Sequence, residues 1–309
     1  MKSTPTSAES PARKLPDGMI GFLGFVLLVS AVHYRLLFDW ARLALGVELH
    51  SYVLLIPFVT GYLIHLQRAA IPAKQHGSPG LAMLPALVGA LALAAYWNMP
   101  AVVAKGVSVD RIAAGMFSYF CFLLAGGFFF FGRRVLGAVA FPVAFLVFIV
   151  PLPSLVIHGL EVFFQHTSAD AAFLLIKASG TPVLRDGLFL QLPGITLQVA
   201  EECSGIRSSL MLFITSLLTS YLFLRRPGLR TALVLSVIVI GIIRNGFRIF
   251  TISMLCVHLD PKWIDSAVHH KGGPIFFALS LIPFFGFLLL LRKWDRKKPS
   301  APPTALPAS

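Results

Sequence analysis

Long apolar blocks alternate with short polar segments along the whole chain. Several blocks reach the roughly 17–25 residues that a helix needs to cross a bilayer. From this pattern we predict about eight membrane-spanning helices, over residues 18–38, 47–66, 81–98, 112–131, 135–152, 208–224, 231–257 and 274–291. The pattern therefore predicts an all-α polytopic membrane protein. The first block runs straight into further membrane segments and lacks a small-residue cleavage site, so we interpret it as a retained span.

Composition agrees with this class, because 57% of the residues are hydrophobic and only 13% are charged. With the N-terminus in the cytoplasm, the basic residues gather on the inner side and most acids fall outside, as the positive-inside rule predicts. The inner set is Lys2, Arg13, Lys14, Arg68, Lys74, Arg133, Arg134, Arg225, Arg226, Arg230, Arg292, Lys293, Arg296, Lys297 and Lys298. Both termini are then cytoplasmic, and the net charge of +13 reflects topology rather than nucleic-acid binding.

The two ends of the chain are rich in Ser, Pro and Ala. Residues 1–17 and 299–309 can bury little apolar surface, so we predict disordered tails. Residues 18–298 are expected to form one membrane domain.

The longest stretch between predicted spans, residues 153–205, lies on the outer face. Within it, residues 155–177 place polar side chains at three- and four-residue spacing, which predicts an amphipathic helix lying in the membrane interface. These side chains are His158, Glu161, Gln165 and Ser168. Residues 186–200 then alternate apolar and polar around Pro193 and Gly194, which predicts a small β-hairpin. The outer face thus carries an interfacial helix, a hairpin and the polar segment that follows it.

That polar segment, Glu201-Glu202-Cys203-Ser204-Gly205-Ile206-Arg207, directly precedes the sixth predicted span. The pKa of a thiol falls at a helix N-terminus and beside cations, so Cys203 is a candidate nucleophile. Arg207 supplies a nearby cation, and Gly205 permits a close approach of the backbone. Glu201 and Glu202 would oppose this by raising the pKa of the thiol. The alternatives are an inert buried thiol or a disulfide to Cys256.

Two arginines lie within the seventh predicted span. Residues 231–243 are too few to cross the membrane, so the helix must continue through Arg244, Asn245 and Arg248. At 1.5 Å per residue, Arg248 lies roughly 26 Å from the inner end, close to the outer boundary. An arginine inside a membrane helix indicates function by default, although Arg248 could also snorkel to the headgroups. Arg244 lies one turn deeper and is expected to bind a backbone carbonyl or a structural acid.

His269 and His270 stand in the outer loop before the last predicted span. Histidine serves as a general acid or base near neutral pH, so either one is a candidate proton carrier. A pair of solvated loop histidines and a zinc site are the alternatives. The other outer histidines, His50, His158 and His166, show no compact ligand spacing. We therefore predict neither a metal nor a cofactor, and we expect a nucleophile, a cation and a proton carrier at one membrane depth.

These residues resemble the motifs of the exosortase/archaeosortase family of membrane-embedded cysteine transpeptidases. The resemblance rests on Glu202-Cys203-Ser204-Gly205-Ile206-Arg207, on Asn245-Gly246-Phe247-Arg248-Ile249, on His269 four residues before Gly273, and on His50-Ser51-Tyr52 ahead of Pro57. It implies a Cys–Arg–His triad of Cys203, Arg248 and either His269 or His270. The family usually has a small residue where this chain has Glu202.

The resemblance also implies a reaction and its partners. Substrates would be proteins with a C-terminal motif such as Pro-Glu-Pro, a transmembrane helix and a basic cluster. Cys203 would form an acyl-thioester near the motif, and an amine or hydroxyl acceptor of the cell envelope would resolve it. The implied location is the bacterial inner membrane, with the active site on the periplasmic face and the lipid bilayer as surroundings.

Two other classes of protein compete with this interpretation. A polytopic transporter would place polar residues near the midplane and interrupt helices in two related halves, whereas this chain concentrates polarity at one face. A non-catalytic assembly factor for exopolysaccharide or envelope export would tolerate the loss of Cys203. Hydrolysis in place of transfer is a variant that the sequence leaves open.

Overall fold

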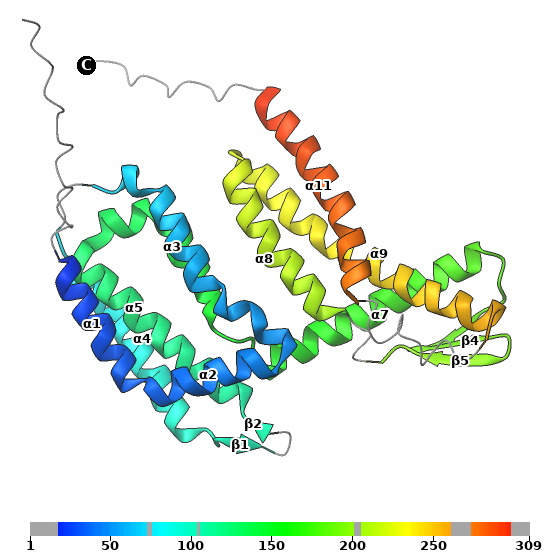
Figure 1. Cartoon of the computed structure of the whole chain (residues 1–309), viewed down its shortest axis with the longest axis horizontal. Helices are drawn as coiled ribbons and strands as arrows, with labels where there is room; N and C mark the ends of the chain where they lie inside the picture. Colours follow the sequence, from blue (N-terminus) through cyan, green and yellow to red (C-terminus); the bar gives the residue numbers. More distant parts are fainter. Residues whose placement is uncertain (1–17, 73–75, 104–105, 201–204, 261–272, 298–309) are drawn as a thin grey trace, which may run out of the picture. The chain divides into compact units, whose positions relative to one another are not determined.

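The computed structural model describes residues 18–72, 76–103, 106–200, 205–260 and 273–297 (Figure 1). Helices dominate these ranges, and a two-stranded sheet and a three-stranded sheet accompany them. Six described helices are long and apolar enough to cross a membrane, and up to eight spans result if two bent helix pairs each count as one. The predicted class, an all-α polytopic membrane protein, is confirmed. The chain divides into two compact units, residues 1–154 and 155–309.

The first unit is built around the long helix α5. Its elements are α1 (Met19–Val32), α2 (Tyr34–Gly46), η1 (Glu48–Leu54), α3 (Ile56–Leu66), η2 (Arg68–Ala70), α4 (Pro79–Asn98), β1 (Val102–Val103), β2 (Gly106–Val107), α5 (Val109–Ala138), α6 (Ala140–Phe145) and η3 (Leu146–Ile149). Helices α1, α2 and α4 pack against α5, and α3 packs against α6 and η3. Between α4 and α5, the buried hydroxyl of Ser118 donates to the carbonyl of Gly89 at 2.8 Å, so this polar group is satisfied.

The first predicted span, 18–38, is wrong as a single straight helix. It consists of α1 and the start of α2, which meet at His33 with a bend of 77°. Helix α2 carries charged side chains at three- and four-residue spacing, namely Arg35, Asp39 and Arg42. One of its faces is therefore polar, and such a helix does not continue an apolar span.

The fifth predicted span, 135–152, is also not one helix. It contains the end of α5, then α6 and η3, and the helical path stops before Pro151 and Pro153. Proline lacks the backbone N–H that would continue the ladder. The predicted gap between residues 131 and 135 is confirmed, because α5 turns at Gly132, where φ is 75°. A Cβ at Gly132 would collide with the carbonyl oxygen of His76, so only glycine fits.

The second unit contains α7 (Ser154–Ala178), β3 (Leu184–Asp186), β4 (Phe189–Leu192), β5 (Ile195–Gln198), α8 (Ile206–Phe223), α9 (Pro227–His258) and α11 (Gly273–Lys297). Helices α8, α9 and α11 pack together around a core that includes Leu212, Leu233 and Phe284. A second core joins α7, the sheet and the far part of α9 through Ala172, Leu190 and Ile249. Helix α9 thus belongs to both cores.

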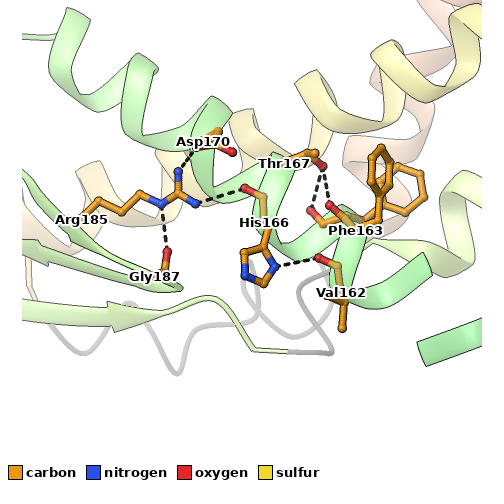
Figure 2. Close-up of polar contacts among 8 residues, drawn as sticks. Val162, Phe163, His166, Thr167, Asp170, Arg185 and Gly187 are labelled. Carbon is orange, nitrogen blue, oxygen red and sulfur yellow. Dashed lines mark hydrogen bonds and ion pairs between the residues drawn. The ribbon is translucent and has the colours of Figure 1, made fainter. Parts of the chain in front are cut away.

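The sheet has the strand order β3-β4-β5, and all of its pairs are antiparallel. Strands β4 and β5 form the predicted hairpin, with Gly194 in its turn at φ 81°. Strand β3 was not predicted, although Asp186-Gly187 is a turn signal that could have indicated it. Arg185 of β3 fastens the sheet to α7 through a salt bridge with Asp170 and bonds to the carbonyls of Gly187 and His166 (Figure 2).

Helix α7 confirms the predicted helix, but two of the four side chains on its predicted polar side are buried. Gln165 and Ser168, which were expected on the polar side, are 5% and 0% exposed. Leu155 and Leu174 are instead 83% and 64% exposed. A periodic pattern reveals two faces without telling which one meets the protein, and near lipid the apolar face can point outward. Whether α7 lies in the membrane interface stays a prediction.

Candidate active site

Several residues of the predicted site lie outside the described ranges. These are Cys203 and Ser204, the neighbouring Glu201 and Glu202, and both His269 and His270. The described members are Gly205, Arg207, Arg244, Asn245 and Arg248. Residues 201–204, the cysteine segment, are flanked by Val199 and Ala200 on one side and by Gly205 on the other, and these flanks are described.

Helix α8 begins at Ile206, and Gly205 is its N-cap residue with φ 70° and ψ 15°. This left-handed conformation favours glycine. A Cβ at Gly205 would stand 2.9 Å from Nη2 of Arg244 and 3.0 Å from Oδ1 of Asn245. The close approach expected at Gly205 is therefore an approach to side chains of α9. Backbone conformation and space both require the absence of a side chain here.

Arg244 donates from Nη2 to the carbonyl of Gly205 at 3.0 Å and to the hydroxyl of Ser209 at 3.1 Å. The residue is 7% exposed. Of its two predicted partners, a backbone carbonyl or a structural acid, the carbonyl is confirmed. Its Nη1 is buried and has no hydrogen-bond partner within the described part of the chain. Arg244 thus fixes the first turn of α8 and keeps donor capacity at the end where the cysteine segment joins the helix.

Small residues let α9 approach its neighbours at this level. A Cβ at Gly241 would lie 2.9 Å from Oγ of Ser209, and one at Gly246 would lie 2.5 Å from Cβ of Ala171 on α7. Asn245, between these glycines, is 1% exposed. Helices α7, α8 and α9 therefore meet tightly around the first turn of α8.

Arg248 lies one turn beyond Arg244 on α9, and residues four apart share a helix face. It is partly buried, whereas Arg207 in the first turn of α8 is exposed. Arg244, Arg248 and Arg207 are thus three cations near the start of α8. Arg207 lies in its first turn, and Arg248 lies one turn from Arg244 along α9. A helix N-terminus is itself the positive end of the helix dipole, so this region favours an anion.

Sequence reasoning missed the buried polar side chains that complete the site. Gln165 of α7 donates its amide to the carbonyl of Val199 at 3.2 Å. Val199 lies two residues before the cysteine segment, and Gly205 directly follows it. Ser209, whose hydroxyl accepts from Arg244, is 5% exposed. The regular spacing of Gln165 and Ser168 was recognised, but their burial was not.

The remaining candidates have separate surroundings. His166 uses Nδ1 to contact the carbonyl of Val162 in its own helix at 2.9 Å (Figure 2). His50 is buried in η1 of the first unit. In the described ranges, no group of three His, Cys, Asp or Glu residues could hold a metal. Cys256 is 2% exposed in α9. The zinc and disulfide alternatives both involve undescribed residues and stay open.

Comparison with protein-family models identifies one family over most of the chain. The model for transmembrane exosortases matches residues 40–286, a range that contains every predicted site residue. Comparisons with curated proteins and with solved structures found no match. The chain therefore belongs to the transmembrane exosortase family, a family of cysteine-type transpeptidases with a sorting role in membranes.

Proposed function

We propose that this chain is a cysteine transpeptidase that cleaves C-terminal sorting signals at the outer face of a bacterial inner membrane. Its substrates would carry a motif such as Pro-Glu-Pro, a transmembrane helix and a basic cluster. The reaction would pass through an acyl-thioester on Cys203 and end with transfer to an envelope acceptor.

The observation that carries this proposal is the position of Arg244. A buried guanidinium hydrogen-bonds the carbonyl of Gly205, the residue that directly follows the cysteine segment. It does so at the N-terminal end of α8, where the helix dipole is also positive. A buried cation at that end is unfavourable on its own, because the charge is desolvated and repelled. An anion in the same place, such as a thiolate or an oxyanion, would offset both the desolvation of the arginine and its repulsion by the helix dipole.

The second support is that polar side chains hold both flanks of the cysteine segment. Gln165 binds Val199 before it, and Arg244 binds Gly205 after it. Catalytic groups must be positioned within a fraction of an ångström to react efficiently. Buried hydrogen bonds on each flank are suited to restricting the segment that carries Cys203.

The proposed chemistry assigns one role to each group. His269 or His270 accepts the thiol proton, and the sulfur of Cys203 attacks the scissile carbonyl. Arg248 stabilises the oxyanion of the tetrahedral intermediate. The intermediate then collapses, and the leaving amine takes the proton from the histidine, which gives the thioester. An acceptor amine or hydroxyl loses its proton to the histidine, attacks the thioester and releases the thiolate.

The experiment is co-expression with a candidate substrate that carries the three-part signal, followed by intact mass measurement of the substrate. Wild type is expected to remove the C-terminal segment, whereas Cys203→Ala is expected to leave the substrate whole. Cys256→Ala is the matched control and should process normally. Added mass on the product identifies the acceptor, and addition of water alone indicates hydrolysis. Equal processing by Cys203→Ala would remove the nucleophile and favour a transporter or an assembly factor.

A further inference from the structure

The first unit contains an apolar cavity of about 320 Å³. This volume is in the range of small-molecule binding sites, roughly 300–1,000 Å³. Helices α1, α3, α5 and α6 line the cavity, together with Ile71, Val139 and Leu146. Helix α1 packs on α5, and α3 packs on α6, so the cavity lies among the two helix pairs. It belongs wholly to the first unit and is independent of the proposed reaction.

Water is a poor occupant of this cavity. Its lining has one polar side chain, Thr60, whose Oγ1 is buried without a hydrogen-bond partner in the described ranges. A buried water needs about two to four polar partners, and apolar cavities without them stay dry. An empty space would forfeit the dispersion contacts of its walls. The lining therefore fits a hydrocarbon group.

The length of the cavity matches one leaflet of a bilayer. Along α5, the lining runs from Phe120 through Gly127 to Phe131. At 1.5 Å per residue this distance is about 16 Å, which is half of a hydrocarbon core of about 30 Å. A single acyl chain that enters at one surface and ends near the midplane has this reach.

Basic residues mark the end of the cavity near Phe131. Arg133 and Arg134 lie between Phe131 and Val135, and both of these residues line the cavity. Arg68 stands between the lining residues Ile64 and Ile71 of the α3 side. All three arginines are exposed. Their positive charge complements a phosphate headgroup, because basic residues at a membrane surface attract anionic lipids.

We propose that this cavity binds one acyl chain of an anionic phospholipid. The lipid belongs to the leaflet on the side of Arg133 and Arg134, its phosphate contacts these arginines and Arg68, and the end of its chain lies near Phe120. The bound chain completes the packing of the first unit between α1 and α3.

The test reconstitutes the full chain in vesicles of phosphatidylethanolamine. These contain phosphatidylglycerol with a photoactivatable diazirine at the end of one acyl chain. Peptide mapping after illumination is expected to find adducts concentrated at residues 120–124. Phosphatidylcholine with the same labelled chain tests the charge requirement. It is expected to label this segment about 100-fold less, since each of the three arginines near an anionic lipid contributes about fivefold in binding.

Two pairs of variants separate the chain site from the headgroup site. Val143→Trp fills the cavity and should abolish the adducts at residues 120–124, whereas Val147→Trp, at an exposed neighbouring position, should not. Arg133→Gln combined with Arg134→Gln should lower phosphatidylglycerol labelling about 25-fold, toward the phosphatidylcholine level, whereas Arg35→Gln should leave it unchanged. Leu124→Phe provides a smaller filling change if Val143→Trp does not fold.

Three results would overturn the proposal. Adducts spread evenly over the exposed helix faces and insensitive to both filling variants would exclude a chain site. Equal labelling by the two lipids, unchanged in the arginine variants, would exclude an anionic headgroup. Displacement of the lipid adducts by a synthetic substrate transmembrane helix would assign the cavity to a peptide instead.

Discussion

An arginine of α9 holds each end of α8, and the two ends are otherwise unlike. At the C-terminal end, Arg230 donates from Nε to the carbonyl of Leu224 at 2.8 Å. At the N-terminal end, Arg244 donates from Nη2 to the carbonyl of Gly205 at 3.0 Å. The bonds are chemically the same. Their electrostatic settings are opposite, because a cation is favourable at a helix C-terminus and unfavourable at an N-terminus.

The neighbours of the two arginines sharpen the contrast. Arg230 lies over the ring of Tyr221, and Asp295 accepts from the backbone N–H of Arg225 close by. Arg244 is buried and forms no salt bridge with a described acid. The C-terminal arrangement is what stability alone would select. The N-terminal arrangement lowers stability because it places positive charge beside the cysteine segment. Such a cost is typical of a functional site.

Replacing Arg244 is expected to have the largest effect. Arg244→Met removes two hydrogen bonds from a charged donor, each worth about 1.5–3 kcal/mol. Substrate processing by folded protein should fall by about 100-fold, because about 1.4 kcal/mol corresponds to each factor of ten. Processing is measured by intact mass of the co-expressed substrate, normalised to the amount of folded enzyme.

Arg230→Met is the matched control, because it removes the same type of bond between α9 and α8. It should lower the thermal stability of the purified protein by about 1–3 kcal/mol and leave processing unchanged. If both variants lost processing equally, the two ends of α8 would have equivalent structural roles. The contrast between them would then carry no functional meaning.

The sequence predicted much of this region, but not the contact that defines it. Apolar blocks of sufficient length must be helices in a bilayer, because every backbone group has to be satisfied there. This constraint is why the spans around α8 and α9 were found, and why the helix was expected to continue past residue 243. The partner of Arg244 is distant in the chain, and hydropathy carries no information about which carbonyl a buried arginine will bind.

Gly205→Ala is expected to have the next largest effect. The left-handed conformation costs a non-glycine residue about 1–2 kcal/mol, and the added Cβ would stand 2.9 Å from Nη2 of Arg244. Processing should fall by about tenfold as the Arg244 bond is displaced. The measurement is the same mass assay, combined with thermal unfolding of the purified variant.

A glycine in the first unit provides the comparison. A Cβ at Gly115 would stand 2.6 Å from Cδ1 of Leu36, so Gly115→Ala overpacks an apolar contact. Overpacking costs about 1–3 kcal/mol of stability, and processing by the remaining folded protein should be unchanged. If Gly115→Ala lost processing without losing folded protein, the expectation that this substitution affects stability alone would be wrong.

Helix α7 shows a second limit of sequence reasoning. Gln165 and Ser168 of its predicted polar face are buried, whereas His158 of the same face is exposed. In water the apolar face must turn inward, whereas in a membrane lipid can cover it. The pattern alone therefore could not assign Gln165 to the site. Its role depends on its hydrogen bond to Val199, the residue that follows strand β5 of the hairpin.

Gln165→Leu should have a moderate effect. It removes the bond to Val199 on the other flank of the cysteine segment, worth about 0.5–1.5 kcal/mol, so processing should fall by about fivefold. Ser168→Ala is the control, because its buried hydroxyl has no partner in the described ranges. It should leave processing unchanged and stability equal or slightly higher. A larger loss in Ser168→Ala than in Gln165→Leu would show that the hydroxyl, not the amide, positions the segment.

Asp170→Asn should have the smallest effect and tests whether loosening the sheet alone impairs the site. It removes the salt bridge to Arg185, but the Asp170 side chain is 62% exposed, so solvent screens the pair. Exposed pairs of this kind contribute about 0.2–1 kcal/mol. Arg185 also retains its bonds to Gly187 and His166, which hold the sheet on α7 without the carboxylate. Thermal stability should therefore fall slightly, while processing stays at the wild-type level. A loss of processing as large as that of Gln165→Leu would mean that the sheet, rather than the buried amide, positions Val199 and the segment after it.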